Sequence, residues 1–149
     1  MALDAASLHL PLGFPFDTSL NAVRLIRSGI FDQVPDMQLI VAHVGGVIPY
    51  LKARIVTYST PSPLITDAPD LRYPMQHYLD KLYVDTVCYD RAALDCCYQS
   101  LGTGQMLYGT DHPFGAYGTA AELLEQLECS VAERELIYSG NAQRLFKLV

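Results

Sequence analysis

The stretch QLIVAHVGG, residues 38–46, joins a short apolar run to a histidine and two glycines. Two more short apolar runs follow, LYVDT at residues 82–86 and MLYG at residues 106–109. Runs of four or five apolar residues between turn formers are typical of buried parallel strands. The sequence therefore predicts strands at residues 38–42, 82–86 and 106–109.

Helical patterns lie around and between these runs. Apolar spacing predicts a first helix at about residues 18–32, with Asp17 or Thr18 as its N-cap, and a second helix at 91–101. The capping boxes TAAE (119–122) and SVAE (130–133) each predict the start of a further helix. A last helix is predicted from about residue 141. Residues 57–73 are rich in proline and turn formers and predict a long loop, and loops of that length are often functional. Alternating strands and helices predict an α/β fold with a parallel sheet.

The composition narrows the classes of partner. A formal net charge of -6 gives no electrostatic support for binding to nucleic acid or to an anionic membrane. The apolar stretch at residues 39–51 is shorter than the roughly 20 residues of a spanning helix, and residues 1–13 do not resemble a secretory leader. The four cysteines show no CxxC pairing, which favours small buried side chains in a reducing cytoplasm over a disulfide or a reactive thiol.

Two polar residues directly follow predicted strands. His43 comes after the strand at residues 38–42, and Asp111 follows the strand at 106–109 through Thr110. The carboxyl ends of parallel strands are where α/β folds bind ligands, and an imidazole with a carboxylate suits a metal-assisted acid–base site. The alternative is a structural histidine and a capping aspartate. The glycines at 45 and 46 predict positive φ or a close approach of the backbone to a ligand.

Four segments carry a resemblance to a known family: GFPFDTSLNAVRLI (13–26), HVGGVIPYLKARI (43–55), YGTDHPFG (108–115) and GNAQRLF (140–146). In this order and approximate spacing they resemble the amidohydrolase-related decarboxylases, a group that includes aminocarboxymuconate-semialdehyde decarboxylase. The resemblance implies a partial (β/α)8 barrel, with residues 1–149 as the C-terminal part of the barrel domain. A closed barrel needs eight strands and about 250 residues, so this chain cannot form one alone.

The resemblance also implies roles for individual residues. Asp111 matches the aspartate that binds a divalent metal, usually zinc and sometimes manganese. His43 matches the acid–base catalyst. Arg54 matches an arginine that reaches the substrate carboxylate from a neighbouring subunit, and Phe14 and Phe16 lie in the loop that resembles a wall of the substrate pocket.

The remaining metal ligands of that family have no counterpart here. They are two histidines of an H-x-H motif and one further histidine, and the sequence contains no H-x-H. His9 is a poor substitute, and His112 is expected to have a role in a turn. Because a metal site usually needs three or four protein ligands, a metal is expected to bind weakly, or not at all, to this chain alone.

These observations favour a metal-dependent decarboxylase of an aromatic or unsaturated carboxylic acid that is incomplete as an isolated chain. A metal-dependent hydrolase of a lactone or an amide is one alternative, and a non-catalytic remnant or interaction module is another. Three strands leave two unpaired edges, so we expect a homo-oligomer or association with a missing N-terminal half.

Overall fold

A parallel sheet of three short strands organises the molecule. The computed structural model describes residues 8–115 and 118–148, and its strands are β1 (Ile40–Val41), β2 (Tyr83–Asp85) and β3 (Met106–Leu107). The order is β1-β2-β3, with Val84 opposite Val41 on one side and opposite Met106 on the other. All three strands lie within the predicted runs and are shorter than predicted.

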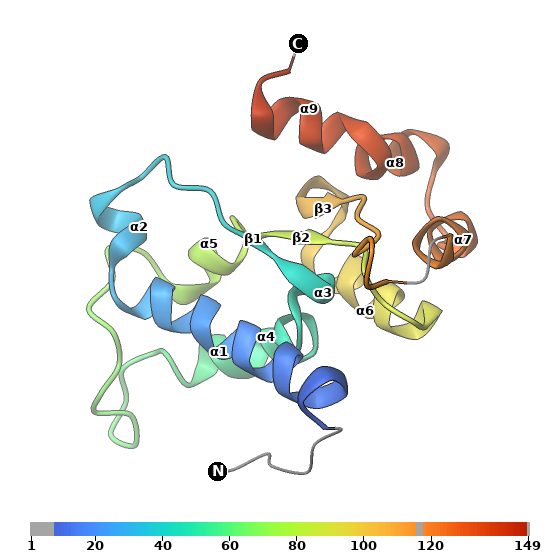
Figure 1. The fold of residues 1–149 in the computed structure, drawn as a ribbon. Helices are drawn as coiled ribbons and strands as arrows, with labels where there is room; N and C mark the ends of the chain where they lie inside the picture. The colour runs from blue at the N-terminus through green and yellow to red at the C-terminus, as the bar shows by residue number, and fades with distance from the viewer. Residues whose placement is uncertain (1–7, 116–117, 149) are drawn as a thin grey trace.

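Helices surround this sheet. Before β2 the chain forms a π-helical turn η1 (His9–Gly13), α1 (Phe14–Arg27), α2 (Ile30–Gln33), α3 (Ala42–Gly45), α4 (Ile48–Thr57) and α5 (Met75–Leu79). After β2 follow α6 (Arg91–Leu101), a 3-10 turn η2 (Thr103–Gln105), α7 (Thr119–Gln126), α8 (Val131–Glu135), a π-helical turn η3 (Leu136–Gly140) and α9 (Asn141–Phe146). Figure 1 shows α1, α2 and α5 towards the β1 side of the sheet and α7 to α9 towards the β3 side, with α4 and α6 packed side by side between these two groups.

The long helix predicted at residues 18–32 differs from the observed structure. Helix α1 begins at Phe14, with Pro15 in its first turn, so neither Asp17 nor Thr18 is the N-cap. Proline suits that turn because it has no N–H to leave unpaired. The helix ends where Gly29 adopts a φ of 74°, and α2 begins after it. The predicted single helix is therefore two helices.

Among the other predicted helix starts, those at Asp90 and Ser130 are confirmed and the one at Thr119 is wrong. The Asp90 side chain accepts a hydrogen bond from the backbone N of Ala92, and α6 ends at Gly102 as predicted. The Ser130–Glu133 capping box is confirmed. The one predicted at Thr119 and Glu122 is wrong, because Gly118 is the N-cap of α7 and no side chain caps it.

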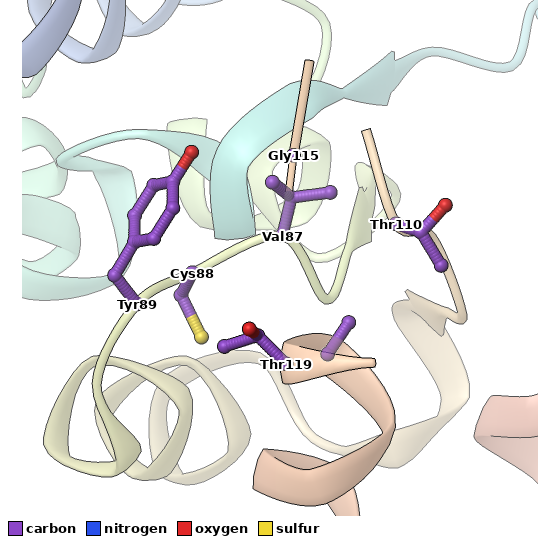
Figure 2. Close-up of a pocket in the computed structure, with 7 residues that line it drawn as sticks. Val87, Cys88, Tyr89, Thr110, Gly115 and Thr119 are labelled. Atoms are coloured by element: carbon purple, nitrogen blue, oxygen red, sulfur yellow. The ribbon is translucent and has the colours of Figure 1, made fainter. Parts of the chain in front are cut away.

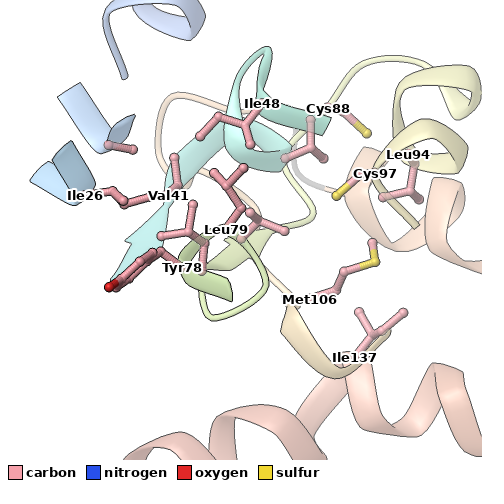
Figure 3. Close-up of a cluster of buried hydrophobic side chains, with 14 of the residues drawn as sticks. Ile26, Val41, Ile48, Tyr78, Leu79, Cys88, Leu94, Cys97, Met106 and Ile137 are labelled. Atoms are coloured by element: carbon pink, nitrogen blue, oxygen red, sulfur yellow. The ribbon is translucent and has the colours of Figure 1, made fainter. Parts of the chain in front are cut away.

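The core forms where both groups of helices meet the sheet. Figure 3 shows Ile26, Ile48 and Tyr78 on the side of α1, α4 and α5, and Leu94, Cys97 and Ile137 on the side of α6 and η3. All four cysteines are free; Cys88 and Cys97 are buried, as predicted, and Cys96 and Cys129 are half-buried. Burial raises the pKa of Cys97 to about 12, since the thiolate would lose its hydration there. Cys97 therefore acts as a small apolar side chain.

One buried polar side chain fastens the C-terminal helices to the sheet. Asn141 is fully buried, and its Nδ2 donates to the carbonyl oxygens of Thr103 at 2.6 Å and Met106 at 2.7 Å. The backbone N of Tyr108 also donates to the carbonyl of Ile137 at 2.9 Å. The position of β3 relative to η3 and α9 depends on these bonds.

Replacing Asn141 should destabilise the fold. In Asn141→Ala two buried carbonyl groups lose their donor, and we expect the free energy of unfolding in urea to fall by about 1–3 kcal/mol. Gln143→Ala is the matched control, because Gln143 is an exposed residue of the same helix. Equal effects of the two substitutions would contradict this role for Asn141.

Within the described part of the chain, no helix is both long enough and apolar enough to cross a membrane. Residues 1–7, on which the expectation about a secretory leader partly rests, lie outside that part.

Candidate acid–base site

His43 is presented by an unusual turn at the carboxyl end of β1. It has φ 57° and ψ 60°, and the next residue, Val44, has φ 50°. The left-handed conformation costs a non-glycine residue roughly 1–2 kcal/mol, and it is rarest for β-branched residues such as valine. Two consecutive left-handed residues persist only where the surrounding structure holds them, and such strain is concentrated at functional sites.

Asp85, at the end of the neighbouring strand β2, holds this turn. Its Oδ1 accepts a hydrogen bond from the backbone N of Val44 at 3.0 Å and another from that of Val87 at 3.0 Å. Burial raises the pKa of Asp85, although these bonds oppose the shift. Asp85 was not among the predicted site residues. The available signal was an acid in an apolar strand that lies between the strands before His43 and Asp111.

The two glycines after Val44 allow helix α1 to pack closely against this turn. Gly45 and Gly46 have φ of 79° and 62°, which confirms the predicted positive φ. A Cβ on Gly46 would overlap the Pro15 carbonyl oxygen and the Ser19 Oγ, so the close approach is to helix α1. The buried Ser19 hydroxyl accepts from the backbone N of Val47 at 2.8 Å and donates to the Pro15 carbonyl at 2.6 Å.

Asp111 follows β3 in a second left-handed turn. Its φ is 57°, and its carbonyl oxygen accepts hydrogen bonds from the backbone N of Phe114 and of Gly115, both at 2.7 Å. A Cβ on Gly115 would overlap the carbonyl oxygen of Thr110, which is why glycine stands there. This tight turn sets the direction of the Asp111 side chain.

The two turns bring the predicted pair together. His43 Nε2 and Asp111 Oδ2 are 4.0 Å apart, and each side chain is about one-third exposed, at 30% and 33%. That distance is longer than a direct hydrogen bond, and both atoms can contact one small ligand. The expectation that a histidine and an aspartate on one rim of the sheet converge is supported by this geometry.

The other predicted residues lie apart from this pair. The exposed Arg54 is in the last turn of α4, and its Cζ is 4.6 Å from the centre of the Tyr58 ring. Phe14 and Phe16 are exposed in the first turn of α1, and Phe14 packs edge-on against His9 at 4.5 Å. No contact of these three predicted substrate-binding residues with the His43–Asp111 pair is found in the described part of the chain.

The donors present are the right kind for a divalent metal but too few. Carboxylate and imidazole both ligate zinc and manganese. Among residues 8–115 and 118–148, however, no group of three or more histidine, cysteine, aspartate or glutamate side chains could hold an ion. A metal at this site would therefore need further ligands from outside the described residues.

A small pocket adjoins the Asp111 turn. It is lined by residues that include Cys88, Thr110, Gly115 and Thr119, and its volume is about 10 Å³ (Figure 2). A space of that size holds about one water molecule. Burial raises the pKa of the Cys88 thiol, so this residue is an apolar part of the wall.

Parallel strands that alternate with helices, with a histidine and an aspartate converging at their carboxyl ends, are typical of part of an α/β barrel of the metal-dependent hydrolase type. The sequence model of the amidohydrolase family matches residues 5–148. The chain belongs to this family.

Several of the sequence relatives are named as decarboxylases. The γ-resorcylate decarboxylase of Polaromonas sp. (strain JS666) is 32% identical over 136 residues, which cover 91% of this chain and 42% of that protein. The 2-amino-3-carboxymuconate-6-semialdehyde decarboxylase of Dictyostelium discoideum is 29% identical, over 88% of this chain and 37% of that protein.

Solved structures agree with these sequence relatives. The dihydroxybenzoic acid decarboxylase from Polaromonas sp. JS666, solved with bound manganese and the inhibitor 2-nitroresorcinol, superposes with a TM-score of 0.79 at 31% identity, over 91% of this chain and 41% of that one. The apo IDCase of Metarhizium anisopliae gives a TM-score of 0.82 at 28% identity, over 97% and 43% of the two chains. The chain thus spans about two fifths of the length of these relatives.

Two substitutions at Asp85 separate its hydrogen bonding from its charge. Asp85→Val removes the acceptor for two backbone N–H groups, so it should lower the free energy of unfolding by about 1–3 kcal/mol. Asp85→Asn keeps an acceptor oxygen and removes the charge. The measurement is urea denaturation from about pH 3 to about pH 7.

The sign of the pH effect follows from the raised pKa of Asp85. The folded chain holds this proton more tightly than the unfolded chain, whose carboxyl has the ordinary value of 3.8. The stability of the native protein relative to Asp85→Asn should therefore fall as the pH rises from 3.8 through the raised value. A constant difference between the two proteins across that window would show that the buried charge carries no such cost.

Proposed function

We propose that this chain supplies the acid–base part of a metal-dependent decarboxylase that acts on an aromatic or unsaturated carboxylic acid. The observation that carries the proposal is the 4.0 Å approach of His43 Nε2 to Asp111 Oδ2 at the carboxyl ends of β1 and β3. The names of three relatives, a γ-resorcylate decarboxylase, a 2-amino-3-carboxymuconate-6-semialdehyde decarboxylase and a dihydroxybenzoic acid decarboxylase, support the choice of reaction. Because the chain spans only about two fifths of those proteins, the activity belongs to a more complete assembly.

His43 is suited to move the proton that decarboxylation requires. Its Nε2 faces the same space as the Asp111 carboxylate, and the left-handed turn fixes its direction. A proton delivered to the substrate carbon that bears the carboxylate creates an electron-deficient intermediate. The bond from that carbon to the carboxylate then breaks, its electron pair stays on the carbon, and carbon dioxide leaves.

Asp111 is the metal ligand in this proposal, with zinc or manganese as the ion. Manganese is the metal named for the Polaromonas structure, which supports a divalent ion here. Such an ion would supply positive charge and lower the pKa of bound water towards neutrality. His43 lies close enough to exchange a proton within that space.

Arg54, Phe14 and Phe16 complete the proposal on the substrate side. The guanidinium of Arg54 is suited to a substrate carboxylate, because it offers paired hydrogen bonds. Arg54 is exposed in the last turn of α4, which is compatible with a contact between its guanidinium and a substrate bound to a neighbouring subunit. The exposed rings of Phe14 and Phe16 are available as part of a pocket wall.

The last part of the proposal concerns the assembly and the compartment in which this chain works. We place residues 1–149 as the C-terminal part of the barrel domain, completed by a missing N-terminal half or by other subunits. The edge of β1, and exposed apolar side chains such as Leu10, Ile40 and Phe146, support association, whereas the edge of β3 is covered by η3 and α9. The four unpaired cysteines support a reducing compartment such as the cytoplasm.

Metal binding tests the site directly. We expect manganese or zinc to bind the chain weakly, and Asp111→Ala to weaken binding by about tenfold or more because it removes the assigned ligand, whereas His43→Ala, which removes the proton carrier, should weaken binding less. Manganese binding is measured by electron paramagnetic resonance. Asp70→Ala, an exposed aspartate of the loop before α5, is the control. Equal binding by the Asp111 and Asp70 variants would contradict the assignment.

The reaction is tested with the missing part of the barrel supplied. The chain is co-expressed with the portion of a γ-resorcylate decarboxylase that it does not cover, and release of carbon dioxide from dihydroxybenzoic acids is measured. We expect turnover that His43→Ala lowers by about 10²–10⁴-fold, the usual contribution of a general acid–base group. Hydrolysis of lactones or amides without carbon dioxide would favour the hydrolase alternative. A metal-loaded assembly with neither activity would favour the interaction module.

Association is tested by light scattering of the purified chain. The unpaired edge of β1 and the exposed apolar side chains predict a dimer or a larger species, with a mass that rises with protein concentration. A monodisperse monomer over the whole concentration range would contradict the proposed association.

A further inference from the structure

A second pocket lies away from the His43–Asp111 pair. It is enclosed by α2, by α5 and by the end of the loop between α4 and α5, and its volume is about 150 Å³. Aromatic side chains form much of its wall, among them Phe31, Tyr73 and Tyr78. The sequence had already marked residues 57–73 as a long loop of the kind that often has a function.

The topology separates this pocket from the acid–base site. Residues 34–39 run from α2 to the start of β1, and residues 80–82 run from α5 to the start of β2. The pocket therefore lies at the amino ends of these strands, whereas His43 and Asp111 lie at the carboxyl ends of β1 and β3. Figure 1 shows α2 and α5 near the start of β1, with α3 at its other end.

The carboxylate in the pocket wall is already engaged. Asp32 Oδ1 accepts a hydrogen bond from the Tyr78 hydroxyl at 2.6 Å, and Oδ2 accepts one from the backbone N of Arg72 at 3.0 Å. These two bonds lower the pKa of Asp32, so it is ionised at neutral pH and both of its oxygens already accept hydrogen bonds from residues of the pocket wall. The Tyr78 oxygen in turn accepts from the backbone N of Tyr73 at 3.0 Å.

The two permanent cations that line the pocket are Arg72 and Lys81. Arg72 and Lys81 are exposed residues, and within residues 8–115 and 118–148 neither side chain forms a hydrogen bond or an ion pair. The positive charge of Arg72 does help to lower the pKa of Asp32. Asp80, the acid next to Lys81, is paired with Lys52 at 2.8 Å and accepts from Gln76. His77 also lines the pocket, with its ring stacked on Tyr73 at 4.4 Å.

We propose that this pocket binds a small anion of carboxylate or phosphate type, with Arg72 and Lys81 as the groups that bind its charge. Two permanent cations, Arg72 and Lys81, and one carboxylate, Asp32, line the pocket, and that carboxylate already accepts from two donors, so the net positive charge favours an anion. Arginine and lysine are the side chains that proteins use for both kinds of oxyanion. The Asp32–Tyr78 hydrogen bond and the Tyr73–His77 stack keep the wall in place before a ligand arrives.

The test is an NMR titration of the 149-residue chain with inorganic phosphate and, separately, with acetate. Sodium chloride holds the ionic strength constant, so that general screening is the same at every point. We expect saturable shifts of the backbone amides of Arg72, Tyr73, His77 and Lys81. The variants Arg72→Ala and Lys81→Ala should each weaken the apparent affinity by about fivefold or more. Arg24→Ala, an exposed arginine of α1, should leave it within about twofold of the parent value.

Each outcome has a defined meaning. Saturation by phosphate alone identifies a phosphate site, saturation by acetate alone identifies a carboxylate site, and either supports the proposal. Shifts that rise linearly with concentration, or that are equal in the Arg72, Lys81 and Arg24 variants, overturn it. Amide resonances of residues outside the pocket report whether each variant is folded, and Arg72→Gln replaces Arg72→Ala if that variant is not.

Discussion

The hydrogen bonds that the Asp85 carboxylate accepts from Val44 N and Val87 N are the interaction on which the candidate site depends. Left-handed residues at 43 and 44 each cost roughly 1–2 kcal/mol, and leaving the two backbone N–H groups without an acceptor would cost about 1–3 kcal/mol, so the two are of similar size. Asp85 is the last residue of the central strand. Its carboxylate therefore ties the turn after β1 to the loop after β2, and it fixes His43 relative to the sheet.

Much of the fold could be predicted from local patterns. The three strands, the Asp90 cap, the Gly102 end of α6 and the Ser130 capping box depend on residues that are close in the sequence. The start of α1 could not be predicted in this way. Apolar spacing and a capping aspartate favoured residue 17 or 18, whereas the helix begins at Phe14, where the π-helical turn η1 leads into it and Pro15 fits its first turn.

For the candidate site, the two main residues could be predicted, but the backbone that presents them could not. His43 and Asp111 could be placed because both follow apolar runs, and parallel strands bring their carboxyl ends to one rim. The backbone that aims them could not be predicted, since a left-handed valine contradicts the preference of its residue type. Asp85 and Ser19 also escaped prediction, because each acts through the backbone of a segment distant in sequence. Their partners, Val44 and Val47, are identified only once the turn is folded.

The rigidity of this pair bears on how an incomplete metal site could work. Flexible donors must lose conformational freedom when they bind an ion, and that loss weakens binding. The backbone at His43 and Asp111 is already held in left-handed turns, by the bond from Val44 N to the Asp85 carboxylate for one and by the bonds from Phe114 N and Gly115 N to the Asp111 carbonyl for the other. A partner that completes the barrel would then bring the remaining ligands to a carboxylate and a proton carrier whose backbone is already in place. The strain in the two turns is thus compatible with a site that is shared between this chain and another part of the barrel.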